Sequence, residues 1–125
     1  MKKYEAQCNT ILNQYFREKK FYCFYELKQT GNKETFNFAK IEKVQWEGLP
    51  ATERNGLVWK FSDEISRPKP CDGVSIPPLP SYLVLRFSDK FYFIRFEKII
   101  ALRDEGVISI NRSKVEEIAE RIIKL

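Results

Sequence analysis

Two aromatic-rich segments separated by a short polar turn constrain the fold of this chain more than any other feature. Residues 82–87 and 91–96 are dense in aromatic and branched side chains, and Ser88-Asp89-Lys90 lies between them. This pattern predicts a β-hairpin. With 43% apolar residues, the 125-residue chain can bury a core, and we expect a single domain over residues 1–125.

Apolar spacing predicts helices and strands in the first two thirds of the chain. Residues 2–19 and the segment from 39 to 48 or beyond repeat apolar side chains at helical steps. In the second segment Ile41, Val44 and Leu49 form the apolar stripe, and Pro50 kinks or ends the helix. Strands are predicted over 21–29 and 57–61, with a short strand around 74–76 inside the Pro-rich loop 62–80.

The C-terminal part is predicted to be helical. A short helix covers 97–102, and a last helix opens with Ser113 and Glu116, which have the spacing of a capping box. The residues that this last helix is expected to bury are Val115, Ile118, Ala119, Ile122 and Ile123. Together these elements predict an α/β (α+β) fold in which helices flank a mixed central sheet.

The absence of histidine excludes several kinds of catalytic chemistry. Without His there is no Ser-His-Asp or Cys-His site and no two-histidine metal site, so catalysis would rest on carboxylates, lysines, hydroxyls or an oxygen-bound metal. Cys8, Cys23 and Cys71 are odd in number and lack CxxC spacing, so we expect reduced thiols. Phe and Tyr residues that alternate within strands are more typical of core packing than of base stacking.

The charge balance favours a polyanionic partner without establishing one. The chain carries 22 Lys and Arg against 17 Asp and Glu, a net charge of +5. No segment approaches the about twenty apolar residues that span a bilayer, and the N-terminus lacks the apolar core of a signal peptide. We therefore expect a soluble, cytoplasmic protein, and a phage or viral origin is left open.

The triplet Glu26-Leu27-Lys28 is the first candidate for chemistry. Alternation along a strand directs Glu26 and Lys28 to the same side, where a carboxylate can hold a cation beside an ammonium group. The alternative is an ordinary solvated strand face with opposite charges. Glu18-Lys19-Lys20 has the same E-x-K spacing, but it falls at a helix end where residues two apart diverge.

The second candidate is Asp72, in the segment Arg67-Pro68-Lys69-Pro70-Cys71-Asp72-Gly73. Asp72 follows a stiff proline segment and precedes a flexible glycine, a setting that can hold an acid at the entrance of a strand. The alternative is an ordinary Asp-Gly turn. Nearby Lys60, Arg67 and Lys69 could contact phosphates, and Asp63 could replace Asp72 as a metal ligand.

These segments together resemble the PD-(D/E)xK nuclease superfamily, in particular RecU-like and other small Holliday junction resolvases, over most of the chain. The stretch that looks like the family's E-x-K strand and its following Thr is Phe24-Tyr25-Glu26-Leu27-Lys28-Gln29-Thr30. The stretches similar to later family segments are Phe36-Asn37-Phe38, Ile41 and Gln45 ahead of Leu49, Gly56-Leu57-Val58-Trp59-Lys60-Phe61 and Gly106-Val107-Ile108-Ser109-Ile110. Glu5 matches a family acid in the first helix.

The resemblance implies a restriction-endonuclease-like fold and a metal-dependent site. Glu26, Asp72 and the backbone carbonyl of Leu27 would hold Mg²⁺, for which Mn²⁺ could substitute, and Lys28 would assist the attacking water. Glu5 would join the metal site and Gln45 would support it. One departure is the reversed motif order, because the family's Pro-Asp strand precedes its E-x-K strand. The acid has then migrated, or the core is permuted.

The function implied by this resemblance is a Mg²⁺-dependent DNA endonuclease that acts on branched DNA such as a four-way junction. Symmetric cutting of two strands implies a homodimer, and the apolar hairpin over residues 82–96 is a candidate interface. One alternative is a nucleic-acid-binding protein that keeps a nuclease-like fold without catalysis. Another is a structural or assembly protein whose positive charge serves solubility or packing.

Overall fold

The computed structural model describes residues 2–31, 34–63 and 67–124, with side chains described from residue 7 onward. In chain order the elements are α1 (Lys2–Lys19), β1 (Phe24–Gln29), β2 (Thr35–Asn37), the 3₁₀ helix η1 (Phe38–Lys40), α2 (Lys43–Asn55), β3 (Leu57–Lys60), β4 (Gly73–Ile76), β5 (Ser81–Phe87), β6 (Lys90–Arg95), α3 (Phe96–Asp104), β7 (Ser109–Asn111), α4 (Arg112–Ile118) and β8 (Arg121–Lys124). Within the described ranges, no helix has the length and apolar character needed to cross a membrane.

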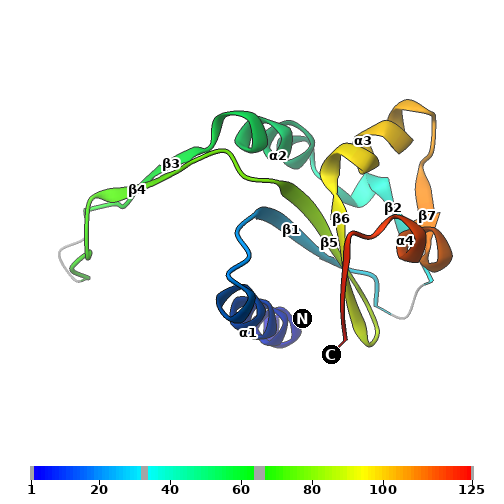
Figure 1. Cartoon of the computed structure of the whole chain (residues 1–125), viewed down its shortest axis with the longest axis horizontal. Coiled ribbons are helices and arrows are strands. Elements are labelled where there is room, and N and C mark those ends of the chain that lie inside the picture. The colour runs from blue at the N-terminus through cyan, green and yellow to red at the C-terminus, as the bar shows by residue number, and fades with distance from the viewer. Residues whose placement is uncertain (1, 32–33, 64–66, 125) are drawn as a thin grey trace.

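A four-stranded mixed sheet organises the fold. The strand order is β1-β5-β6-β8, with β1 parallel to β5 and the other neighbours antiparallel. The predicted hairpin is confirmed, because Phe87 pairs with Lys90 across the turn. Helices flank this sheet, so the coarse prediction of a mixed sheet between helices is also confirmed (Figure 1).

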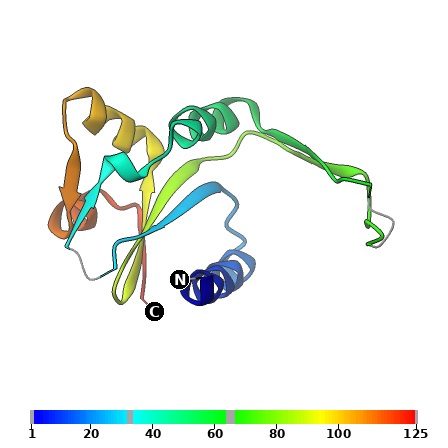
Figure 2. The same cartoon turned by 180° about the vertical axis from the view of Figure 1, so that it is seen from behind.

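The two faces of the sheet support separate apolar clusters. Residues of β5 and β6 alternate between the faces, so Phe91 and Phe93 face α1 while Tyr92 and Ile94 face the other side. The first cluster includes Cys8 and Leu12 of α1. The second gathers side chains from α2, α3, α4, β2 and β7, and Figure 2 shows these elements on the side of the sheet away from α1.

Burial rules out the hairpin as the surface through which copies of the chain would meet. Every residue of β5 except Arg86 is buried, and β6 is buried from Phe91 to Ile94. Both strands lie in the interior of the sheet, with β1 and β8 on their outer sides. The expected dimer interface at residues 82–96 is therefore corrected, because apolar strands that are central in a sheet are covered on both faces.

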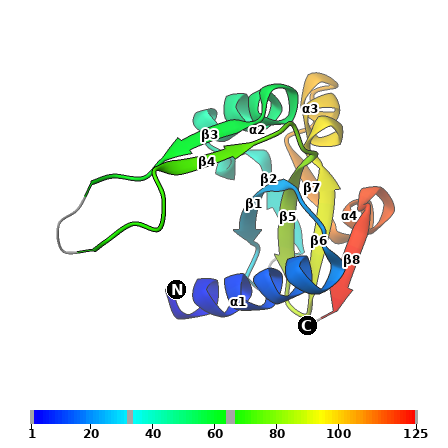
Figure 3. The ribbon, with the colours of Figure 1, turned by 60° about the vertical axis from the view of Figure 1, so that its left-hand side comes forward.

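Strands β3 and β4 form a two-stranded antiparallel arm that projects from the body (Figure 3). Leu57 pairs with Ile76 near the body, and Lys60 pairs with Gly73 toward the far end. The two chains approach so closely that a Cβ at Gly73 would lie 2.3 Å from the carbonyl oxygen of Trp59. The short strand predicted around 74–76 is confirmed as β4, and it belongs to this arm.

The last predicted helix is shorter than expected. α4 ends at Ile118, whereas Ile122 and Ile123 lie in β8, which pairs with β6. The open edge of β6 offers hydrogen bonds to this β-branched segment, and tertiary pairing overrides the helical spacing. The N-cap is Asn111, whose Oδ1 accepts a hydrogen bond from the Lys114 N–H at 2.8 Å, so the Ser113 capping box is corrected.

The second predicted helix is displaced toward the C-terminus. α2 starts at Lys43 and continues through Pro50 to Asn55. Ile41 is buried ahead of the helix, and Val44 is 70% exposed, so neither belongs to a buried stripe of α2. Leu49 packs against the core as predicted, and Trp46 packs there as well. Trp46, two positions after Val44, has more apolar area to bury than Val44 has. Its burial therefore sets how α2 is rotated about its own axis.

Candidate functional site

Glu26 and Lys28 come together on β1, as the strand alternation predicts. The Lys28 Nζ lies 3.6 Å from the Glu26 Oε1, and the two side chains are 19% and 32% exposed respectively. They register with Leu83 and Leu85, which belong to the core on the α2 side of the sheet. Leu27 packs against the α1 side. The pair is therefore a partly shielded carboxylate and ammonium on one face of an edge strand.

Gln45 has a structural role in the helix that covers this face. Its Oε1 accepts a hydrogen bond from the Glu42 N–H at 3.0 Å, which closes a capping box at the start of α2. Gln45 is expected to support a catalytic site, but its side-chain amide already caps the start of α2. A Gln three residues after Glu42, at the start of a helix, is a sequence signal for this cap.

Glu53 is an acid near the sheet that sequence reasoning missed. Its Oε1 accepts hydrogen bonds from the Ser81 N–H at 2.9 Å and from the Arg95 Nη2 at 2.7 Å. Glu53 thereby ties α2 to the start of β5 and the end of β6. Desolvation by burial, the largest single effect, lowers the pKa of Arg95, but the hydrogen bond to Glu53 and its negative charge act the other way. The net effect is a pKa above the ordinary value. The Glu53 Oε1 thus has a structural role, because it accepts both of these hydrogen bonds.

The structure does not bring Asp72 to Glu26. Asp72 lies at the far end of the arm, where its backbone carbonyl accepts a hydrogen bond from the Phe61 N–H at 2.8 Å. Its side chain is 93% exposed and lies 3.2 Å from the Lys69 Nζ. Asp63 also pairs with Lys69. Figures 1 and 3 show the arm extending away from β1, so the sheet does not deliver this acid to the E-x-K strand.

The described side chains do not fit the magnesium site that the resemblance implies. Among residues with described side chains, no group of three or more Cys, Asp or Glu lies close enough to hold a metal ion. Glu26 has Lys28 beside it, and Asp63 and Asp72 share Lys69. Glu5 lies on α1, and its side chain is outside the described part of the chain. Mg²⁺ takes oxygen ligands, and one carboxylate beside an ammonium group supplies too few.

The arm carries an exposed aromatic side chain that lines a hollow together with basic side chains. Trp59 is 59% exposed, and Lys60 and Arg67 are also exposed. A hollow of about 480 Å³ is lined by Trp59, Lys60, Phe61, Ser62, Arg67, Pro68, Lys69 and Pro70. No ion pair joins Lys60 or Arg67 to a carboxylate within the described residues. Trp59 lies outside the core because β3 leaves the body of the protein.

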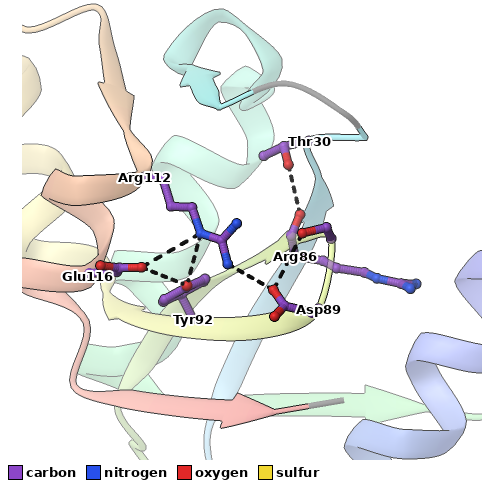
Figure 4. A network of polar contacts seen from close by, with 7 residues as sticks. Thr30, Arg86, Asp89, Tyr92, Arg112 and Glu116 are labelled. Carbon is purple, nitrogen blue, oxygen red and sulfur yellow. Dashed lines mark hydrogen bonds and ion pairs between the residues drawn. The ribbon is translucent and has the colours of Figure 1, made fainter.

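A third polar cluster, shown in Figure 4, has a structural role. Arg112 of α4 donates from Nη2 to Asp89 at 2.8 Å and from Nε to the Tyr92 hydroxyl at 3.3 Å. Glu116 lies 3.6 Å from the Arg112 Nε and accepts from the Tyr92 hydroxyl. The hydrogen bond from Arg112 holds the pKa of Asp89 below its ordinary value. These contacts fasten α4 to the β5–β6 turn.

Comparisons with known proteins add no relative. No protein-family model matches the sequence, and no curated protein or solved structure matches it either. The class that the fold itself defines is a mixed α+β protein with a helix-flanked sheet and a projecting two-stranded arm.

Proposed function

We propose that this protein binds nucleic acid and that the arm is its contact surface. The observation that carries the proposal is that the exposed Trp59 lines one hollow of the projecting arm together with Lys60 and Arg67, two cations that pair with no carboxylate in the described part of the chain. Lysine and arginine bind phosphates, and an exposed indole can stack on a base. A two-stranded ribbon also has the width of the DNA major groove.

The distribution of charge supports the same proposal. The net charge of +5 attracts a polyanion to the whole protein. On the arm, Lys69 pairs with both Asp63 and Asp72, so these two carboxylates neutralise its charge. Its role there is to hold the two acidic residues together. Lys60 and Arg67 are therefore the arm residues whose charge is available to phosphates.

A direct test measures the binding of fluorescently labelled four-way junction, linear duplex and single-stranded DNA at several salt concentrations. The variant Lys60→Ala/Arg67→Ala should weaken binding by about tenfold or more and flatten the salt dependence, because two phosphate contacts are removed. Trp59→Ala should weaken single-strand binding most. Lys40→Ala is the matched control, since Lys40 is exposed on η1, outside the arm.

Unchanged affinity in both arm variants would overturn the assignment of the arm. Absence of salt-dependent binding by the unaltered protein would favour the structural or assembly alternative, in which the positive charge has no nucleic-acid partner.

DNA hydrolysis is a second candidate function, and one observation favours it. Glu26 and Lys28 share one face of β1, with the Lys28 Nζ 3.6 Å from the Glu26 Oε1. A carboxylate and an ammonium group on one strand face are what the resemblance to Holliday junction resolvases implies for its E-x-K strand. The missing acid would have to come from Glu5 or from a second copy of the chain.

The hydrolytic candidate is tested on the same three DNA substrates with Mg²⁺, Mn²⁺ or EDTA. Cleavage that requires the metal, disappears in Glu26→Gln and leaves DNA binding intact would support it. Absence of cleavage under all of these conditions, together with retained binding, would leave a purely binding protein.

A further inference from the structure

Among the strands of the described ranges, β1 has a partner on one edge only. It stands at the end of the sheet order, next to β5. The Phe24 N–H donates to Pro80 O at 2.9 Å and the Thr30 N–H donates to Arg86 O at 3.1 Å. In a parallel ladder, alternate residues bond the same neighbour, so the even-numbered residues of β1 face β5. The backbone groups of Tyr25, Leu27 and Gln29 consequently point to the open edge.

An open edge of this kind is a template for another strand. Its unpaired N–H and C=O groups can add a strand from another chain, and proteins usually block such edges with charge, proline or bulges. β1 contains no proline. Its charged residues Glu26 and Lys28 compensate each other within the strand. Repulsion therefore does not protect this edge.

The alternation of β1 limits how a second copy of the same strand could pair with it. The free backbone groups belong to odd-numbered residues, so in an antiparallel pair these residues must lie opposite odd-numbered residues of the second copy. The twofold axis that relates the two strands therefore passes through a residue position and not between two residues. An axis at position 26 would place two Glu26 side chains opposite each other, and an axis at position 28 would oppose two Lys28 side chains. Like charges directly opposite destabilise a sheet.

Among the registers with the twofold axis at a residue of β1, only the axis at Leu27 places Glu26 and Lys28 of the two copies opposite each other. Glu26 then lies opposite Lys28 of the second copy, and Lys28 lies opposite its Glu26. These are non-hydrogen-bonded pairs, in which opposing side chains approach most closely. Leu27 meets Leu27, and Tyr25 meets Gln29. The backbone gains about six hydrogen bonds, two at each odd-numbered pair.

We propose that β1 pairs antiparallel with β1 of a second copy, centred on Leu27, to form a continuous sheet across a homodimer. This inference does not rest on the proposed nucleic-acid binding. The arm leaves the sheet on the β1 side, as Figures 1 and 3 show, so the second copy would lie beside it.

The test exploits the complementarity of the two charges. Glu26→Lys gives a strand with two positive side chains, and Lys28→Glu gives one with two negative side chains. Each variant alone should dimerise about tenfold or more weakly, because both cross-strand pairs become repulsive. An equimolar mixture should form a heterodimer, and Glu26→Lys/Lys28→Glu should restore the homodimer. Sedimentation velocity over a concentration series measures all of these states.

Glu47→Lys on the exposed part of α2 is the matched charge control and should dimerise like the unaltered chain. Circular dichroism verifies that every variant is folded, and heterodimer formation in the mixture separately shows that the single variants remain competent to pair.

A monomeric unaltered protein at about 100 μM, or single variants that dimerise as well as it does, would overturn the proposal. Dimerisation that survives in the single variants would place the interface elsewhere.

Discussion

Arg112 and Asp89 are joined by a 2.8 Å hydrogen bond although 23 positions separate them in the sequence. One stands at the start of α4 and the other in the turn between β5 and β6. The hydrogen bond from Arg112 lowers the pKa of Asp89 from its ordinary value of 3.8. Folding therefore stabilises the ionised carboxylate.

The first prediction concerns the pH dependence of this contact. Because the folded pKa of Asp89 is lowered, its contribution to stability is present above pH 3.8 and is lost as the pH falls through the folded pKa. Arg112→Met should lower the unfolding midpoint at pH 7, and the difference from the unaltered protein should shrink below about pH 4. Urea titrations at both pH values measure it. A difference independent of pH would show that packing, rather than charge, makes the contribution.

The second prediction concerns Glu53. Glu53→Ala removes the acceptor for the Ser81 N–H and the Arg95 guanidinium, both of which are partly buried. We expect the free energy of unfolding to fall by about 1–3 kcal/mol, the usual result of leaving such donors unpaired. Glu47→Ala, on the exposed part of the same helix, should change it by less than about 0.5 kcal/mol. Equal effects of the two variants would contradict this role for Glu53.

The third prediction separates the two uses of Gln45. If its amide serves the α2 cap alone, Gln45→Ala should lower stability by about 0.5–1 kcal/mol and Gln45→Glu should retain most of it. DNA binding, and any cleavage, should be unchanged in both variants once the protein is folded. A loss of cleavage in the stable Gln45→Glu protein would instead assign Gln45 to a catalytic site.

The fourth prediction concerns thiol reactivity. Burial raises the pKa of Cys23 to about 12, so its reactive thiolate is scarce near neutral pH. Cys8 is buried, whereas Cys71 is exposed on the arm. A thiol reagent at pH 8 should modify one cysteine quickly and the other two only after unfolding. Cys71→Ser should abolish the fast phase, and a fast phase that persists in this variant would contradict the protection of Cys8 by burial and of Cys23 by its raised pKa.

Local patterns in the sequence are sufficient for several elements. The β5–β6 hairpin, the first helix and the shared face of Glu26 and Lys28 were predictable because each depends on neighbours a few residues away. The end of α4 was not, since Ile122 and Ile123 have the spacing of either a helix or a strand. The free edge of β6 selects the strand, and that edge exists only in the folded protein.

The candidate site shows the same division. The sequence by itself determined the apolar hairpin, the E-x-K alternation on β1 and the surplus of positive charge. Only the tertiary structure decided that residues 57–63 and 67–76 leave the body as an arm, which carries Asp72 away from Glu26 and exposes Trp59. The physical reason is that side-chain alternation is a property of one strand, whereas the meeting of two distant carboxylates depends on the direction in which the intervening strands run.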